Sequence, residues 1–247
     1  MMRLSRPVLA LFALLAPLAL AACVQPPRPN DYGAFRAADP HSIAIVPAVN
    51  RSLEVTAADY YLSTVSIPLA ERGYYVFPVH LVKRVMEDDG LSDADLVHAA
   101  PTEQVAALFG ADAVLYVTIQ VWESNYAVFS TTTRVTLDYA LKDGQTGEAL
   151  WKDTEQVFYQ PQSSGGGIAG LIAQAIAAAA ERAAPNYMPL ARQANWMAVY
   201  RLGRGLPAGP YAPKYGQDQD AFPTAQKVET KKAETETPAA TPAAATQ

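Results

Sequence analysis

Cysteine and histidine are scarce in this chain of 247 residues, which contains one cysteine, Cys23, and three histidines. A single cysteine excludes an internal disulfide framework and a zinc site built from several thiolates. The histidines are His41, His80 and His98. They fall in separate segments, and none has a second ligand at metal spacing such as i+4. The sequence therefore predicts no metal site, and the fold has to be stabilised by its core.

Blocks of basic residues are also absent. The chain has 19 Lys and Arg against 24 Asp and Glu, a net charge of −5. Residues 1–22 carry two arginines and no acids, so the rest of the chain has 17 basic and 24 acidic residues and a net charge of −7. An acidic chain without a basic patch is not expected to bind nucleic acid.

Catalytic and cofactor motifs are missing as well. The chain has no Gly-x-Ser-x-Gly elbow, and no Lys-Ser/Thr pair follows the triple glycine at 165–167. The acids around Gly90 resemble a calcium loop, but Ala99 stands where that loop needs a glutamate. We therefore expect a non-enzymatic protein without a cofactor.

The N-terminal segment has the pattern of a signal peptide. Basic residues begin it, a run of 15 mostly apolar residues follows from Val8 to Ala22, and small residues precede Cys23. A membrane-spanning helix needs about 20 residues, so this run is short for a span. Residues 20–23, Leu-Ala-Ala-Cys, resemble the lipobox of bacterial lipoproteins. The resemblance implies cleavage between Ala22 and Cys23 and acylation of Cys23, which would anchor the chain to a membrane.

The residue after the cysteine bears on location. In bacterial lipoproteins an aspartate at that position commonly retains the protein in the inner membrane, and here the position is Val24. The resemblance therefore implies an outer-membrane lipoprotein on the periplasmic side, with surface exposure as the alternative.

Hydrophobic periodicity after residue 42 predicts one domain with strands and helices. Strands are expected at 42–47, 74–78, 113–122, 126–141 and 149–159, and helices at 57–72, 81–86, 101–109, 168–183 and 185–200. Pro68 is expected to kink or split the first helix. Strand and helix alternate before consecutive hairpins, which indicates an α/β fold with a mixed sheet of about five strands, an antiparallel half and flanking helices.

Alternation within the long strands predicts which side chains are buried. Leu115, Val117, Ile119 and Val121 are expected on one face of the first long strand. On the next strand, Val135, Leu137, Tyr139 and Leu141 are expected on one face, with Arg134, Thr136 and Asp138 opposite.

Composition suggests four segments. Residues 1–22 form the signal peptide, and residues 23–41 are a lipidated, proline-rich tether expected to be extended. Residues 42–216 form the α/β domain. Residues 217–247 are dominated by Lys, Glu, Thr, Ala and Pro, and are predicted to be a disordered tail.

Two groups of residues are candidate interfaces. The helix at 168–183 follows the triple glycine and is apolar on most sides, with Gly166 and Gly170 at small-xxx-small spacing. Its outer strip, formed by Leu171, Ile172 and Ile176, predicts homo-oligomerisation. A second group, made of Trp122, Tyr126 and Phe129, lies near a hairpin end. Its members are interpreted as core or rim packing, with an anchor for a partner as the alternative.

Several strings resemble a proteobacterial lipoprotein family of unknown function, typified by surface lipoproteins of pathogenic cocci. They are LAERGYYVFPV at 69–79, LFGADAVLYVT at 108–118 and the triple glycine. The turn DGQTGE at 143–148 is similar to one in CsgG-like proteins. The resemblance implies a TolB N-terminal-like or CsgG-like fold and a CsgG-like lipoprotein partner. A CsgG-type pore is not implied, because the hairpin connections near Ser124 and Gly144 are short.

Three functions remain open from the sequence. The first is a non-enzymatic component of an envelope transport or assembly complex. The second is a periplasmic ligand-binding lipoprotein, with pocket walls from Tyr74, Tyr75 and Tyr116. The third is a cell-envelope hydrolase, which would need an acid pair such as Asp138 with Glu155 across neighbouring strands.

Overall fold

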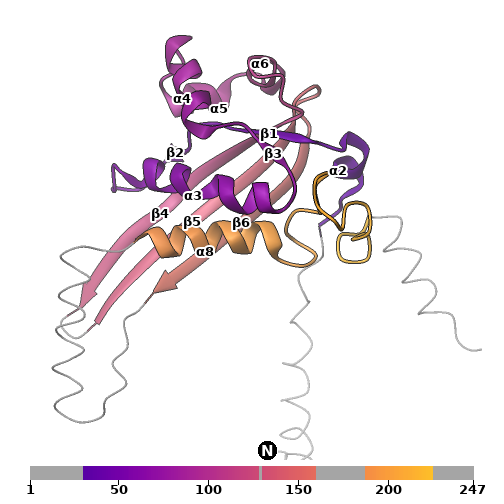
Figure 1. The fold of residues 1–247 in the computed structure, drawn as a ribbon. Coiled ribbons are helices and arrows are strands. Elements are labelled where there is room, and N and C mark those ends of the chain that lie inside the picture. Colours follow the sequence, from indigo (N-terminus) through magenta and orange to yellow (C-terminus); the bar gives the residue numbers. More distant parts are fainter. Residues whose placement is uncertain (1–29, 128–129, 160–186, 225–247) are drawn as a thin grey trace, which may run out of the picture.

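The computed structural model describes residues 30–127, 130–159 and 187–224, without the side chains of residues 126, 127, 130 and 131. These residues form a mixed α/β domain (Figure 1). The helices are α2 (Gly33–Ala38), α3 (Ala57–Glu71), α4 (Val79–Asp88), α5 (Ala94–Ala99), α6 (Thr102–Ala107) and α8 (Tyr187–Tyr200). The strands are β1 (Ser42–Ile45), β2 (Val49–Asn50), β3 (Tyr75–Val76), β4 (Ala113–Ala127), β5 (Ser130–Asp143) and β6 (Ala149–Tyr159).

One six-stranded sheet runs through the domain. Its order is β3-β1-β4-β5-β6, and β2 also pairs with β4. Strand β1 is parallel to β3 and β4, and β2 is parallel to β4, whereas β4, β5 and β6 are antiparallel. The predicted class, an α/β fold with a mixed sheet and an antiparallel half, is confirmed. The additional strand β2 has two residues, too few for a period-two pattern.

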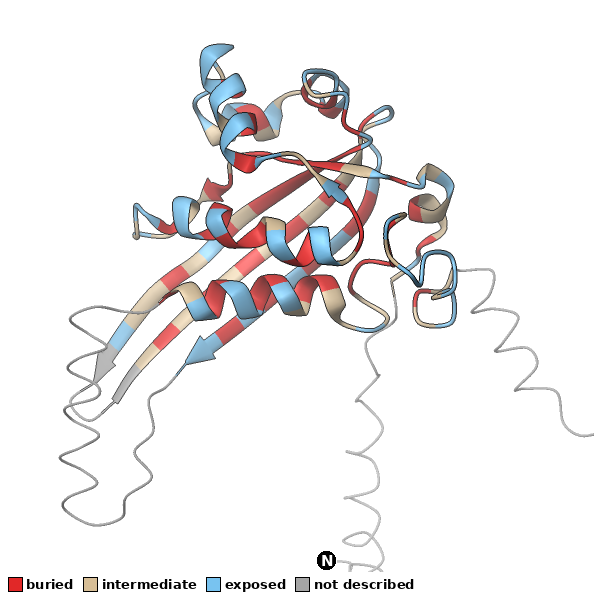
Figure 2. Ribbon diagram, in the orientation of Figure 1, coloured by how far each residue is buried: buried red, intermediate tan, exposed pale blue. Residues whose placement is uncertain are grey.

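Helices cover the two faces of the sheet unequally. Helices α3 and α8 lie next to each other over one face, with α8 packed on β5 and β6 (Figures 1 and 2). Buried residues of the sheet and of α3 and α8 form the main core there. A smaller core lies under α4, α5 and α6, on the opposite face of the parallel half. Among the described residues, helices therefore cover most of the antiparallel half on one side only.

A buried hydrogen-bond chain joins three elements of the main core. The Tyr139 hydroxyl on β5 donates to Asn195 Oδ1 on α8 at 2.7 Å. Asn195 Nδ2 in turn donates to Thr64 Oγ1 on α3 at 2.9 Å. These bonds satisfy polar atoms that would be costly to bury unpaired, and they fix the position of both helices relative to the sheet.

The alternation predicted for β5 is confirmed, and that for β4 fails at one point. Val135, Leu137, Tyr139 and Leu141 are buried. In β4, the register changes between Ile119 and Val121, which adds one residue to that strand. Because an extra residue reverses the alternation, Val121 turns away from the core and Trp122 enters it.

Helix α3 matches its predicted range and is not split. It continues through Pro68 to Glu71. Proline removes one backbone hydrogen bond, but only three residues follow it before the helix ends. The lost bond lies in the last turn, where it breaks little of the helix.

The predicted tether and tail both extend too far into the domain. Helix α2 lies within residues 23–41, and the side chains of Tyr32 and Phe35 are buried. Phe222, beyond the predicted domain end, is also buried, and its ring meets Tyr32 edge-on at 5.3 Å. The Tyr32 amide donates to the Pro223 carbonyl at 3.3 Å. The packed domain therefore reaches from about Asn30 to Thr224.

None of the helices in the described part of the chain is long and apolar enough to cross a membrane. The helix predicted at 168–183 lies outside the described residues.

Candidate functional site

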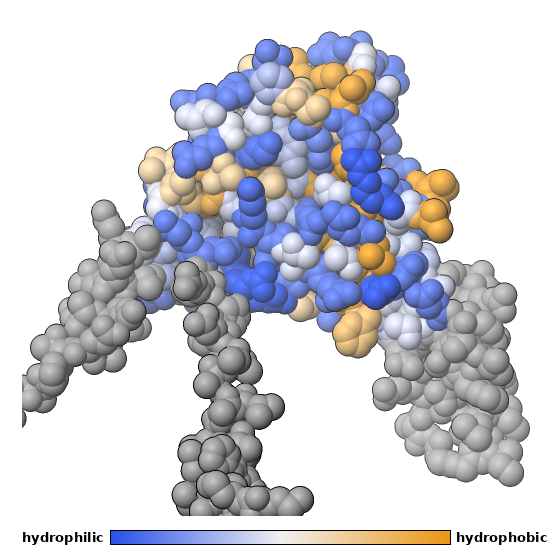
Figure 3. Space-filling model, turned by 180° about the vertical axis from the view of Figure 1, so that it is seen from behind, coloured by the Kyte–Doolittle hydropathy of each residue, from blue (hydrophilic) through white to orange (hydrophobic). Residues whose placement is uncertain are grey.

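No described helix covers most of one face of the antiparallel half of the sheet. We call it the open face. Its members are Thr118, Gln120, Val121 and Glu123 on β4, Arg134, Thr136, Asp138, Ala140 and Lys142 on β5, and Lys152, Thr154, Gln156 and Phe158 on β6. Seen from behind, the molecule shows a mainly hydrophilic surface (Figure 3). The strands therefore present a broad polar surface with an exposed aromatic ring, Phe158, toward one end.

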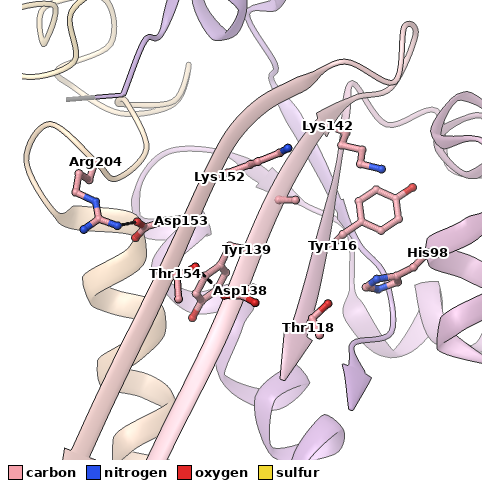
Figure 4. Close-up of a pocket in the computed structure, with 11 residues that line it drawn as sticks. His98, Tyr116, Thr118, Asp138, Tyr139, Lys142, Lys152, Asp153, Thr154 and Arg204 are labelled. Atoms are coloured by element: carbon pink, nitrogen blue, oxygen red, sulfur yellow. Dashed lines mark hydrogen bonds and ion pairs between the residues drawn. The ribbon is translucent and has the colours of Figure 1, made fainter. Parts of the chain in front are cut away.

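A hollow of about 530 Å³ opens on this face beside α5 (Figure 4). Ala140 lies between Tyr116 and Lys152 in the strand register. A methyl group flanked by two long side chains leaves space above the sheet, which accounts for the hollow. This volume is within the usual range for small-molecule sites, roughly 300–1,000 Å³.

One end of the hollow carries positive charge. Lys142 Nζ lies 4.6 Å from the centre of the Tyr116 ring, a cation–π arrangement. Lys152 also lines the hollow. Among the described residues, neither ammonium group has a carboxylate within 4.0 Å. Two ammonium groups without an acidic partner thus face the same space.

Tyr116 and His98 form an aromatic wall. Their rings meet edge-on with centres 5.1 Å apart. His98 Nε2 is 3.0 Å from the Pro47 carbonyl oxygen, which can only accept, so Nε2 carries the proton and Nδ1 stays available as an acceptor. Burial lowers the pKa of His98 below its usual value, so the ring is neutral at pH 7.

The other end of the hollow is formed by a row of polar side chains. Thr118, Asp138 and Thr154 are neighbours across β4, β5 and β6. Gln120 Nε2 donates to Asp138 Oδ2 at 2.6 Å, and Thr154 Oγ1 donates to Asp138 Oδ1 at 2.7 Å. Since each carboxylate oxygen can accept about two hydrogen bonds, Asp138 retains capacity for a further donor.

The acid pair considered for a hydrolase does not exist. Asp138 is opposite Thr154, whereas Glu155 is opposite Leu137, so the two carboxylates point to opposite faces of the sheet. Asp138 lies on the open face, and Glu155 is buried on the core face. The prediction that Asp138 and Glu155 form an acid pair is therefore wrong.

Glu155 has a different acidic neighbour, Asp153, two residues before it on β6. Both are buried, and each meets an arginine that follows α8: Asp153 pairs with Arg204, and Glu155 Oε2 is 2.7 Å from Arg201 Nη2. Apart from the carboxyl–carboxyl hydrogen bond that protonated Glu155 makes with Asp153, Asp153 Oδ2 and Glu155 Oε1 have no hydrogen-bond partner in the described part of the chain. Burial, together with the charge and hydrogen bond of Asp153, outweighs the arginines and raises the pKa of Glu155 to about 7.

The aromatic candidates from the sequence do not form one cluster at the surface. Trp122 is 1 % exposed, and its ring packs with Tyr60 at 6.3 Å and Tyr187 at 5.5 Å between centres. This placement agrees with core packing for Trp122. Tyr126 lies in β4 opposite Thr131, and its side chain is not described. Phe129 is outside the described residues.

The predicted helix interface, which consists of Gly166, Gly170, Leu171, Ile172 and Ile176, also lies outside the described residues.

The tyrosines suggested as pocket walls are dispersed. Tyr116 lines the hollow, but Tyr74 is buried with its hydroxyl donating to the Pro207 carbonyl at 2.8 Å, and Tyr75 stacks edge-on against Phe77. No group of three or more His, Cys, Asp or Glu side chains that could hold a metal ion occurs among the described residues.

Sequence reasoning missed the convergence of Lys142, Lys152 and His98. Alternation along β5 does place Lys142 on the same face as Asp138. The register of β6 and the position of α5 decide the rest, and neither is encoded in a local pattern.

The family of the chain follows from comparison with known proteins. Residues 30–211 match the model of the family described as "Putative lipoprotein GNA1162-like". The chain therefore belongs to the GNA1162-like lipoprotein family. A relative from Neisseria meningitidis serogroup B, "Putative lipoprotein NMB1124/NMB1162", is 34% identical over 167 residues, which cover 67% of this chain and 78% of the relative. The predicted resemblance to a lipoprotein family of unknown function is confirmed.

Solved structures are similar over part of the chain. The crystal structure of lipoprotein GNA1162 from Neisseria meningitidis is 31% identical, with 60% of this chain and 100% of that chain covered and a TM-score of 0.48. A PelC dodecamer from Paraburkholderia phytofirmans is 16% identical, with 55% of this chain and 84% of that chain covered and a TM-score of 0.35.

Proposed function

We propose that this lipoprotein is a non-enzymatic component of a cell-envelope transport or assembly complex. It is anchored by acylated Cys23 to the periplasmic side of the outer membrane, and a CsgG-like lipoprotein is its partner. The open face is the surface on which that complex is assembled.

The observation that carries this proposal is the uneven covering of the sheet. Helix α8 packs along one side of β5 and β6, whereas on the other side, among the described helices, α6 contacts only one end of β5. The exposed side chains of Lys152, Thr154, Gln156 and Phe158 line that side of β6. An extended, rigid surface with a polar majority and one large exposed aromatic is typical of transient protein interfaces.

Several polar groups on the open face form bonds that hold the strands together. Asp138 accepts from a side chain on each neighbouring strand. Farther along, Arg134 Nη2 lies 2.5 Å from Glu123 Oε1, which ties β5 to β4. Such cross-strand pairs stabilise and position a sheet surface, and they favour binding over covalent chemistry.

Site-specific photo-crosslinking in intact cells tests the proposal. A photo-crosslinking amino acid replaces Gln156, which is exposed on the open face, in the full-length acylated protein. The matched control replaces Gln193, which is exposed on the opposite side, on α8. We expect ultraviolet light to join the Gln156 variant to an envelope protein that mass spectrometry identifies, and the Gln193 variant to give no such product.

Crosslinks from Gln193 alone, or from neither position, would contradict a docking role for the open face. A product containing a second copy of this chain would place homo-oligomerisation on the open face instead of on the helix at 168–183. A product with a lipoprotein of another family would retain the complex and reject the CsgG-like partner.

A ligand-binding lipoprotein is the second candidate function. It is favoured by the hollow beside α5, with its unpaired lysines and aromatic wall. Both functions can share the open face, because the hollow occupies only the part nearest α5.

A further inference from the structure

We propose that the hollow on the open face binds a small hydroxylated organic anion, such as a sugar acid or a sugar phosphate. Lys142 and Lys152 take its carboxylate or phosphate group, and the row containing Asp138 takes its hydroxyl groups. This inference rests on the second candidate function, names its ligand class, and does not depend on the partner complex.

The two lysines supply the anion-binding end. Each ammonium group has three N–H donors, and among the described residues neither group is paired with an acid. Lys142 is held against the Tyr116 ring. That contact positions the side chain and leaves the N–H donors that point away from the ring for an incoming anion, which meets a charge that is already positioned. Lys152 approaches from β6, on the other side of Ala140 (Figure 4).

The opposite end suits hydroxyl groups. Asp138 can accept further hydrogen bonds, and the hydroxyls of Thr118 and Thr154 lie in the same row. His98 adds an acceptor, because its Nε2 is committed to the Pro47 carbonyl and its Nδ1 is not. A ligand with an anionic group alone would leave these acceptors to water, whereas a polyol can donate to them directly.

The positive charge of Lys142 and Lys152 in the hollow is opposite in sign to the net charge of the chain. From Cys23 onward the chain carries 17 basic and 24 acidic residues. General attraction therefore favours cations, and a bound anion would have to be held by specific contacts in the hollow. The hollow is open to solvent, so raising the salt concentration should weaken binding.

Isothermal titration calorimetry of the full-length acylated protein in neutral detergent tests the site. The probes are glucuronate, glucose 1-phosphate, neutral glucose and acetate. We expect heat from glucuronate or glucose 1-phosphate, whichever carries the preferred anionic group, and weaker binding of glucose and acetate by tenfold or more. Raising NaCl from 20 to 300 mM should weaken the tighter probe severalfold.

Substitutions then locate the site. Lys142→Met and Lys152→Met keep the aliphatic chain and remove the charge, and each should weaken the tighter probe about tenfold. Lys83→Met is the matched control, because Lys83 pairs with Asp59 at 3.1 Å between α4 and α3. The melting temperature of each variant shows that it is folded.

Equal binding of glucose and glucuronate, equal losses in all three lysine variants, or no heat with any probe would overturn the proposal. Because the titration contains no partner protein, it can succeed where crosslinking from Gln156 fails, and the two proposals are tested separately.

Discussion

Asp153 and Glu155 are two carboxylates on the core face of an edge strand, a position usually filled by apolar side chains. Arg201 and Arg204 compensate them from the segment that ends α8. Tyr139 and Tyr61, the nearby titratable groups on β5 and α3, are buried, and their pKa values are raised by burial, so they stay neutral. Burial and the neighbouring Asp153 therefore hold back the ionisation of Glu155 in spite of the arginines.

This arrangement predicts a loss of stability on the alkaline side. The pKa of Glu155 is about 7 in the folded protein, above its ordinary value of 4.5, so the folded state binds the extra proton between these values. The free energy of unfolding should then fall as the pH rises from about 4.5 through 7, because the unfolded state releases its proton first. Glu155→Gln removes this dependence, on the order of 1–3 kcal/mol. Urea unfolding at pH 5 and pH 8 measures it.

Glu123→Gln is the control for that experiment. Glu123 lies on the open face, where hydrogen bonds from Arg134 and Asn125 lower its pKa. Its contribution is present above the ordinary pKa and is lost on acidification, so its substitution should leave the loss between pH 5 and 8 in place. An equal pH response in wild-type and Glu155→Gln proteins would show that the buried pair does not titrate in this range.

Helix α2 and the segment after α8 pack together and cover one end of the main core. Asp218 connects them: its Oδ1 is 2.6 Å from Arg36 Nη2, its Oδ2 is 3.6 Å from Arg72 Nη2, and it accepts from the Ala208 amide at 2.5 Å. Phe222 fills the space beside Tyr32. These contacts join segments about 180 residues apart, so the first and last described residues stabilise one another.

Two truncations test whether residues 217–224 stabilise the domain. A chain ending at Gly216 loses Asp218 and Phe222, whereas a chain ending at Thr224 keeps both. We expect the first to melt at least about 5 °C below the second, because burial of one aromatic side chain contributes about 2–3 kcal/mol. Phe222→Ala in the full-length chain should reproduce most of this loss. Equal melting temperatures for the two truncations would mean that residues 217–224 add nothing to the core.

The sequence predicts the long elements well, because their hydrophobic pattern repeats several times. Strand β6 has the predicted bounds, 149–159, and α3 differs from its prediction by one residue. Short elements are different, because α2, α5 and β2 have six residues or fewer. Tyr32, just before α2, and Phe35 within it lie in a proline-rich segment, and only the contacts of Tyr32 with Phe222 and of Phe35 with Tyr74 show that they belong to the core.

The candidate site is harder to predict because it depends on register. The register shift in β4 near Gln120 exchanges the faces that Val121 and Trp122 occupy, and no residue type there predicts the shift. The row of Tyr116, Ala140 and Lys152 comes from three strands, so the hollow appears only when all three are aligned. Local patterns predict which face a side chain takes, but not which side chains become neighbours across strands.

At the scale of the whole molecule, the early start of the packed domain limits its distance from the membrane. If Cys23 is acylated, Asn30 follows it by only seven positions. Seven residues span at most about 25 Å, against about 65 Å for the tether predicted to reach His41. The Asn30 amide donates to the Gly203 carbonyl at 3.1 Å, so the anchor leaves the domain beside the segment that follows α8.

Replacing Cys23 with serine tests this attachment. The packed domain begins at about Asn30, so Cys23→Ser should keep the melting temperature of the domain and move the protein to the soluble fraction after an alkaline wash. Val24→Asp is the control that keeps the acylated cysteine, and lipoprotein sorting predicts that it moves from the outer-membrane to the inner-membrane fraction. A Cys23→Ser protein that stays with the membrane would show that another part of the chain holds it there. Since the short tether keeps the domain near the bilayer, such a contact would be expected on the surface around Asn30 and Gly203.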